Sequence, residues 1–224
     1  MSVILNNEIS KLKKSILTLC GMVENAVDAV MTSDRKKAEA VIDNDIEIDH
    51  FELDVEEECL KILALHQPVA GDLRYVIACL KMNNDLERIG DLAVNIAKRA
   101  LSFYSIPTAE MPVNLRPLCE CTKNALGKSL DALIRLDADL AAAGLAYDDV
   151  IDEMNRENHA KLLGLMHQHP ENVERYLNLL NVARHLERIG DYATNIDEDV
   201  IYMVNGAIVR HRTGIDGEFK KKRK

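Results

Sequence analysis

Eight acidic residues of this 224-residue chain stand in four pairs, and the two members of each pair are four positions apart. The pairs are Asp45 with Asp49, Glu87 with Asp91, Asp148 with Asp152, and Glu187 with Asp191. Side chains at this spacing share one face of an α-helix, where two like charges cost about 0.2–0.5 kcal/mol. A bound cation would offset that cost, and hard cations prefer carboxylate oxygens as ligands. The pairs therefore predict metal binding, and oxygen-only ligands suit Mg²⁺, Mn²⁺, Ca²⁺ or ferric iron. The candidate ions for this chain are iron, manganese, magnesium or zinc.

The two pairs in each half of the chain are predicted to meet in space. An antiparallel hairpin is expected around Pro68, and about 20 residues separate it from Asp49 on one side and from the Glu87 and Asp91 pair on the other. At about 1.5 Å per residue, both pairs lie roughly 30 Å from the turn. A hairpin around Pro170 brings the other four carboxylates level in the same way. The competing explanation is that these residues form a solvated acidic helix face with basic neighbours. The repetition of the pairs and their equal distances from the turns favour metal binding over this explanation.

A six-residue sequence occurs twice, 100 positions apart. Leu-Glu-Arg-Ile-Gly-Asp spans residues 86–91 and recurs at residues 186–191, and Asn-Ile follows each copy at the same offset. Asp45 and Asp49 likewise match Asp148 and Asp152. A repeat of this length holds three helices, so the expected fold is all-α, with two tandem three-helix bundles related by internal duplication.

Apolar residues at helical spacing place the elements along the chain. The expected helices run from about Leu5 to Met31, from Ala38 to a stop at Pro68, from Val69 to Tyr104, from Leu115 to Leu136, from Ala138 to Gln168, and from Pro170 to near Gly206. The corresponding domains are residues 1–104 for the first repeat, 105–117 for a linker, 118–206 for the second repeat and 207–224 for a basic, mobile tail.

Composition narrows the class of protein. A net charge of −9 argues against nucleic-acid binding, which needs a basic surface. No apolar run approaches the roughly 20 residues that span a bilayer, so the chain is not expected to be embedded in a membrane. The N-terminus carries Glu8 and lacks the apolar core of a signal peptide. The five cysteines show no CxxC spacing, which is typical of reduced thiols in a cytoplasmic protein.

Other residues point to packing more than to chemistry. Gly90 and Gly190 stand inside predicted helices, where glycine costs about 1 kcal/mol, so they are expected to permit close helix approach or to make room for a ligand. His185 stands where the first repeat has Asp85, so it could be a ligand in one site only, and a surface position is the favoured interpretation. Neither repeat has the Glu-x-x-His motif of di-iron bundles. Because no phosphate loop or nucleophile motif is present either, the chain is not expected to be an enzyme.

The same motifs carry a resemblance to a known family. Residues 63–74 (Leu-Ala-Leu-His-Gln-Pro-Val-Ala-Gly-Asp-Leu-Arg), residues 85–91 and Asn95-Ile96 resemble the first repeat of the PhoU family, the accessory and regulatory proteins of the phosphate-specific transport system. Residues 184–191 and 193–196 resemble its second repeat. The resemblance covers nearly the whole chain. It implies two three-helix bundles that bind multinuclear metal clusters through the same four acidic pairs.

The resemblance also implies a function. Such proteins are cytoplasmic, often dimeric, negative regulators of phosphate uptake and of the phosphate regulon. They are thought to dock between the ATPase subunit of the phosphate transporter and a membrane sensor histidine kinase.

Three alternatives remain at this point. One is a PhoU-like accessory protein of another transporter or of a stress response. The second is a metal-dependent phosphatase that uses the clustered carboxylates and a bound water. The third is a helical bundle whose acidic pairs bind nothing.

Overall fold

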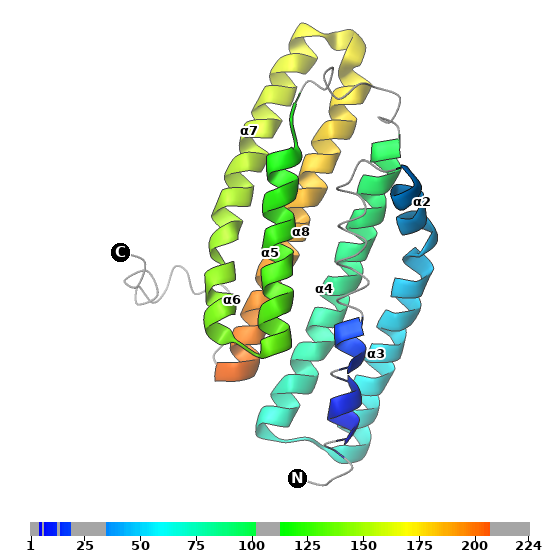
Figure 1. Cartoon of the computed structure of the whole chain (residues 1–224), viewed down its shortest axis with the longest axis vertical. Helices are drawn as coiled ribbons and strands as arrows, with labels where there is room; N and C mark the ends of the chain where they lie inside the picture. The colour runs from blue at the N-terminus through cyan, green and yellow to red at the C-terminus, as the bar shows by residue number, and fades with distance from the viewer. Residues whose placement is uncertain (1–4, 6, 13, 19–34, 102–112, 207–224) are drawn as a thin grey trace, which may run out of the picture.

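A computed structural model describes residue 5 and residues 7–12, 14–18, 35–101 and 113–206 of the chain. Every regular element in these ranges is helical, which confirms the predicted all-α class (Figure 1). No helix in the described ranges has the length and apolar content needed to cross a membrane. The predicted tail, residues 207–224, and most of the predicted linker lie outside the described residues.

The first repeat is built around a long antiparallel hairpin. Its helices are α2 (Arg35–Asp43), α3 (Asp45–His66) and α4 (Ala70–Leu101). Helix α3 ends where Gln67 adopts a left-handed conformation, with φ of 44°, and the buried Pro68 follows it. Because proline has no N–H to continue the helix, the chain turns here, as the sequence predicts.

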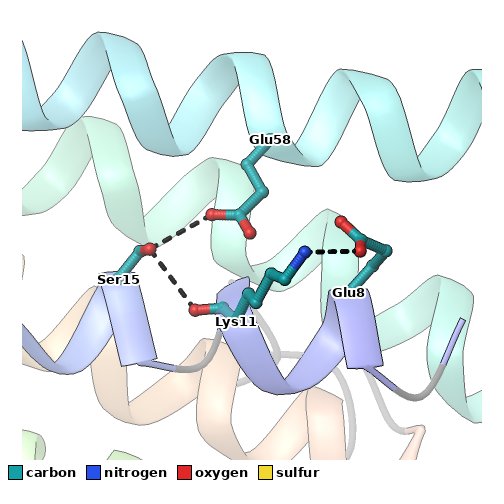
Figure 2. Close-up of polar contacts among 4 residues, drawn as sticks. All are labelled: Glu8, Lys11, Ser15 and Glu58. Carbon is teal, nitrogen blue, oxygen red and sulfur yellow. Dashed lines mark hydrogen bonds and ion pairs between the residues drawn. The ribbon is translucent and has the colours of Figure 1, made fainter. Parts of the chain in front are cut away.

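An N-terminal helical segment, residues 7–12 and 14–18, completes the first bundle. Leu12 and Ile16 are fully buried in the core. Figure 2 shows the polar side of this segment, where the Ser15 hydroxyl donates to Glu58 of α3 at 3.1 Å. Lys11 pairs with Glu8 at 2.8 Å within the segment itself. The segment is thus held to α3 by apolar burial, with one polar contact at its edge.

The second repeat has the same plan. Its elements are α5 (Arg116–Arg135), α6 (Ala138–Gly144), α7 (Ala146–Gln168), the short 3-10 helix η2 (Pro170–Asn172) and α8 (Val173–Asn205). Asp137 caps α6, because its carboxylate accepts hydrogen bonds from the backbone N–H groups of Asp139 at 3.0 Å and Leu140 at 2.9 Å. Gly206, with φ of 69°, ends α8 where the sequence predicts the end of the sixth helix.

The predicted second and fifth helices are each broken once, and this part of the sequence prediction was wrong. The first break lies at Asn44, between α2 and α3, and the second at Leu145, between α6 and α7. Backbone hydrogen bonds continue through both breaks, from Asn44 N–H to Ala40 O at 3.0 Å and from Leu145 N–H to Ala141 O at 3.3 Å. Apolar spacing continues across such a bend, so the periodic pattern does not reveal it.

The two repeats share one hydrophobic core. Helices α4 and α8 pack side by side between the bundles (Figure 1), and buried residues of both repeats, including Leu86 and Leu186, belong to a single cluster. Lys81 of α4 also reaches Asp199 of α8, with 3.6 Å between Nζ and Oδ1. The acidic pairs are therefore held on helices whose inner faces are fixed by the common core.

Candidate metal site

The eight predicted carboxylates lie on the paired helices of the two hairpins. Asp45 and Asp49 are on α3, Glu87 and Asp91 on α4, Asp148 and Asp152 on α7, and Glu187 and Asp191 on α8. Helix α3 packs against α4, and α7 packs against α8 (Figure 1). Each repeat therefore presents its two acidic pairs on neighbouring antiparallel helices.

In the second repeat the structure brings three of these carboxylates together. One oxygen from each of Asp152, Glu187 and Asp191 lies within 4.8 Å of the other two. Asp148 lies beside this group, and the Thr194 hydroxyl donates to its Oδ1 at 3.3 Å. Asp152 and Asp191 are exposed and Glu187 is half-buried, so an ion from solution can reach the cluster.

Mutual repulsion within this cluster is visible in its protonation equilibria. The pKa of Asp191 is raised to about 6, first by burial and then by the charges of Glu187, Asp148 and Asp152. Burial and Asp152 raise the pKa values of Asp148 and Glu187 as well. Burial, the largest cause, and the like charges together therefore disfavour the ionised carboxylates.

The neighbouring arginines offset only part of these shifts: Arg184 and Arg188 act to lower the pKa of Glu187, and Arg188 acts to lower that of Asp191. Arg188 extends toward Tyr192, with Nη2 3.4 Å from the phenolic oxygen. In the described part of the chain, no ion pair joins Asp152, Glu187 or Asp191 to a basic side chain. Metal loading therefore decides between a bound ion and the competing explanation from the sequence, a solvated acidic face with basic neighbours.

The first repeat holds a looser arrangement. Burial raises the pKa values of Asp45 and Glu87. The charge of Asp49 adds to the rise at Asp45, and the charge of Asp91 adds to the rise at Asp45 and at Glu87. The four carboxylates thus act on one another electrostatically. No three acidic side chains of this repeat come as close as the second-repeat group, among the residues that the structure describes. Arg88 lies 3.5 Å from Glu87 and supplies part of the compensating charge.

Glu52 adds a fifth carboxylate to the first repeat, and the sequence analysis missed it. Its negative charge raises the pKa of Glu87, and burial raises the pKa of Glu52 itself. The fully buried Asn83 of α4 holds it, because the amide Nδ2 donates to both Glu52 Oε1 and Glu52 O at 2.9 Å. Glu52 is three residues after Asp49, so a search for pairs four apart passes over it, and the second repeat has Asn155 at the matching position.

The two helix-interior glycines serve close packing. A Cβ atom on Gly190 would lie 2.8 Å from Ile151 Cδ1, and one on Gly90 would lie 3.3 Å from Ile48 Cδ1. Ile48 and Ile151 are matching residues of the two repeats, so the same contact occurs twice. Of the two roles expected from the sequence, the described contacts support close helix approach, which keeps the acidic pairs of each hairpin near one another.

His185 is half-buried rather than at the surface, so that expectation was wrong. Both ring nitrogens are buried without a hydrogen-bond partner, and the pKa of the imidazole is lowered to about 4 by burial and by Arg99, Arg188 and Arg184. Arg99 belongs to α4 of the other repeat, so the packing of α4 against α8 brings its charge near His185. His185 is therefore a neutral side chain between cationic ones.

The donor set fits a hard cation. The clustered atoms are all carboxylate oxygens, which suit magnesium, manganese or iron, whereas structural zinc sites usually include cysteine or histidine. Asp152, Glu187 and Asp191 would hold such an ion in the second repeat. The positive charge would relieve the repulsion that raises the pKa of Asp191.

Comparison with known proteins identifies the family to which this fold belongs. Its two helical repeats and the acidic faces of their hairpins place this chain in the class of internally duplicated helical-bundle proteins. The PhoU domain model matches residues 12–100 and again residues 115–200. The chain belongs to the PhoU family.

Its relatives align along almost the whole chain. The phosphate-specific transport system accessory protein PhoU homolog of Pseudomonas putida is 39% identical over 213 residues, which cover 92% of this chain and 82% of that protein. The PhoU homolog of Aquifex aeolicus is 36% identical, and the alignment covers 92% of this chain and 95% of that protein. The crystal structure of PhoU from Pseudomonas aeruginosa matches with a TM-score of 0.84 and 37% identity, over 90% of this chain and 99% of that one. The crystal structure of the phosphate transport system regulatory protein PhoU from Streptococcus pneumoniae matches with a TM-score of 0.82 and 28% identity. The match covers 92% of this chain and 99% of that one.

Proposed function

We propose that this chain is an accessory protein of phosphate transport that restrains phosphate uptake and the phosphate regulon when phosphate is plentiful. The observation that carries the proposal is the match of both repeats to the PhoU family, together with relatives named as phosphate-specific transport system accessory proteins. The alignment covers most of each relative's own length, so the likeness extends beyond a shared module.

Its partners in this proposal are the ATPase subunit of the phosphate transporter and a sensor histidine kinase. The chain would contact both in the cytoplasm as a homodimer and would hold the kinase in its phosphatase-favouring state. It would act by docking and not as an enzyme. A helical body with a continuous core supports this role, because docking needs fixed surfaces rather than a moving catalytic loop. The repeat boundaries at residues 1–104 and 118–206 belong to the same proposal.

We further propose that the four acidic pairs bind metal ions, with the second repeat as the stronger site. The proximity of Asp152, Glu187 and Asp191 supports it. Asp148 would complete the ligands of that site, and Asp45, Asp49, Glu87 and Asp91 would form the other. The bound ions would stabilise two hairpin faces whose carboxylates otherwise repel one another.

The regulatory role is tested in the organism that carries the gene. Deletion of the gene is expected to raise expression of a phosphate-repressed reporter in phosphate-rich medium, and the wild-type gene is expected to restore repression. If the reporter stayed repressed without the gene, the chain would not restrain the phosphate regulon. If the reporter for another transporter responded instead, the alternative accessory role would be supported.

The metal sites are tested by elemental analysis of purified protein after loading with iron, manganese, magnesium or zinc and removal of free ions. The wild type is expected to retain metal, and the Asp152→Asn, Asp191→Asn double variant to lose the second-repeat share. Asp149→Asn is the matched control, because Asp149 is an exposed acid on the same helix outside the cluster. Equal metal content in all three proteins would exclude these carboxylates as ligands.

A further inference from the structure

The outer face of α3 carries a row of exposed apolar side chains. Ile46, Leu53 and Leu60 are 62%, 58% and 53% exposed. They follow one another at intervals of seven residues, so they stand in a line along one side of the helix. We call these three residues the α3 stripe. It lies opposite the buried face of α3, so packing among the described residues leaves it exposed.

The fold itself does not require this stripe. In α7, the matching helix of the second repeat, the corresponding positions hold Asp149, Arg156 and Leu163. Two of the three are charged, and α7 packs against α8 as α3 packs against α4. Single exposed leucines are ordinary on protein surfaces, whereas a spaced row on one of two equivalent helices suggests contact with another molecule.

Two rows of carboxylates border the α3 stripe. Successive residues of a helix are turned by about 100°, which places Glu47 and Asp54 along one edge and Asp49 and Glu56 along the other. All four are exposed. The 22 residues of α3 include eight Asp or Glu and one Lys, and that Lys61 lies 3.3 Å from Glu57 of its own helix. His50 and Glu57, both exposed, lie between successive residues of the stripe, so the face alternates apolar and polar side chains along its centre and is negative along both edges.

This charge pattern selects the kind of partner. A second α3 carries the same negative edges, and an anionic lipid surface is negative as well, so both would be repelled. A helix with apolar residues on one side and Lys or Arg beside them complements the face in both respects. We propose that the α3 stripe and its acidic edges dock a basic amphipathic helix of a partner protein, an inference that rests on the docking role proposed above.

The proposal is tested with a synthetic peptide that carries leucine along one face and lysine along its flanks. Fluorescence anisotropy is expected to show that the full chain binds this peptide and binds it more weakly as salt rises, because exposed charges are screened. An Ile46→Gln, Leu53→Gln, Leu60→Gln variant is expected to bind at least about tenfold more weakly. All three residues are exposed, so the variant should fold, which far-UV circular dichroism checks.

Leu163→Gln provides the matched control, since Leu163 is 43% exposed at the corresponding position of α7. This variant is expected to bind the lysine peptide as the wild type does. A peptide with glutamate in place of lysine is expected not to bind. Equal binding to the stripe variant, or equal binding of the glutamate peptide, would overturn the proposal. So would light scattering that shows a wild-type dimer and a monomeric stripe variant, because a second copy would then cover the face.

This outcome is independent of the regulatory test. A chain that represses the phosphate regulon but fails to distinguish the two peptides would retain the proposed function and lose this docking surface. A chain that binds the lysine peptide through the stripe but leaves the regulon unchanged would retain the surface and lose that function.

Discussion

The carboxyl group of Asp197 occupies the space that a Cβ atom on residue 144 would need. A Cβ built on Gly144 would lie 2.1 Å from Asp197 Oδ2 and 2.7 Å from its Cγ. Asp197 is 1% exposed on α8, and Gly144 is the last residue of α6. The residues of the first repeat that match Asp197 and Gly144 are Ala97 and Val41. The second repeat therefore has the larger Asp197 in place of alanine and the smaller Gly144 in place of valine.

The first prediction follows from this contact. Gly144→Ala is expected to destabilise the protein by on the order of 2 kcal/mol, because the new methyl group must displace a buried carboxyl group. Gly164→Ala is the control, since nothing lies within 4 Å of a Cβ there and alanine favours a helix interior by up to about 1 kcal/mol. Urea unfolding measures both changes. Equal stability of the Gly144→Ala variant and the wild type would mean that Asp197 moves aside freely.

The second prediction concerns the pH dependence of stability. Burial raises the pKa of Asp197 from 3.8 to about 7, with the charge of Glu198 adding to the rise and the nearby Ser129 side chain opposing it. Between these values the unfolded chain loses the proton and the folded chain keeps it. The contribution of Asp197 to stability is therefore fully present below about pH 4 and is lost as pH rises through about 7.

Asp197→Asn removes this titration. The free energy of unfolding of the variant minus that of the wild type is expected to grow by about 4 kcal/mol from pH 4 to pH 8, at roughly 1.4 kcal/mol per pKa unit. Urea unfolding at several pH values gives this difference. A difference that stays constant across the range would show that Asp197 titrates normally in the folded chain.

The third prediction concerns the acidic cluster of the second repeat. Excess Mn²⁺ at about 100 times its dissociation constant is expected to stabilise the wild type by about 2.7 kcal/mol. Asp191→Asn should remove the share of this gain that the second-repeat site provides. Without metal the same variant should be slightly more stable than the wild type, by less than about 1 kcal/mol, because repulsion falls but the exposed site is screened by water. Thermal unfolding with and without Mn²⁺ measures both effects.

Asp149→Asn is again the control for this experiment, and it should keep the full response to Mn²⁺. An equal response in the Asp191→Asn variant would place the ion elsewhere.

The fourth prediction concerns the buried amide of α4. Asn83→Ala is expected to destabilise the protein by on the order of 2–3 kcal/mol, because two hydrogen bonds to Glu52 are lost and a small cavity remains. Asn84→Ala, at the exposed neighbouring position, should change stability by less than about 0.5 kcal/mol. Chemical unfolding of the two variants distinguishes them. Similar losses in both would mean that the contact with Glu52 adds nothing.

Most of the candidate site could be predicted because helix faces are a local property. Residues four apart share a face wherever the helix lies, so Asp152 and Glu187 with Asp191 could be chosen from spacing alone. Because the two acidic pairs are equally far from Pro170 along the chain, they were predicted to lie at the same height along the hairpin. Glu52 escaped this reasoning, because its part in the first cluster depends on Asn83 from another helix.

The sequence by itself determined the all-helical class, the duplication, the hairpin turns at Pro68 and Pro170, and the faces that carry acid. These features depend on periodicity and on backbone chemistry within a few residues. Only the tertiary structure decided which side chains meet. The packing of α4 against α8 brings Arg99 near the buried nitrogens of His185, and that of α6 against α8 sets Asp197 on Gly144. The bends at Asn44 and Leu145 occur where apolar spacing is unbroken. Contacts of this kind join residues far apart in the chain, and no spacing rule along a single helix specifies them.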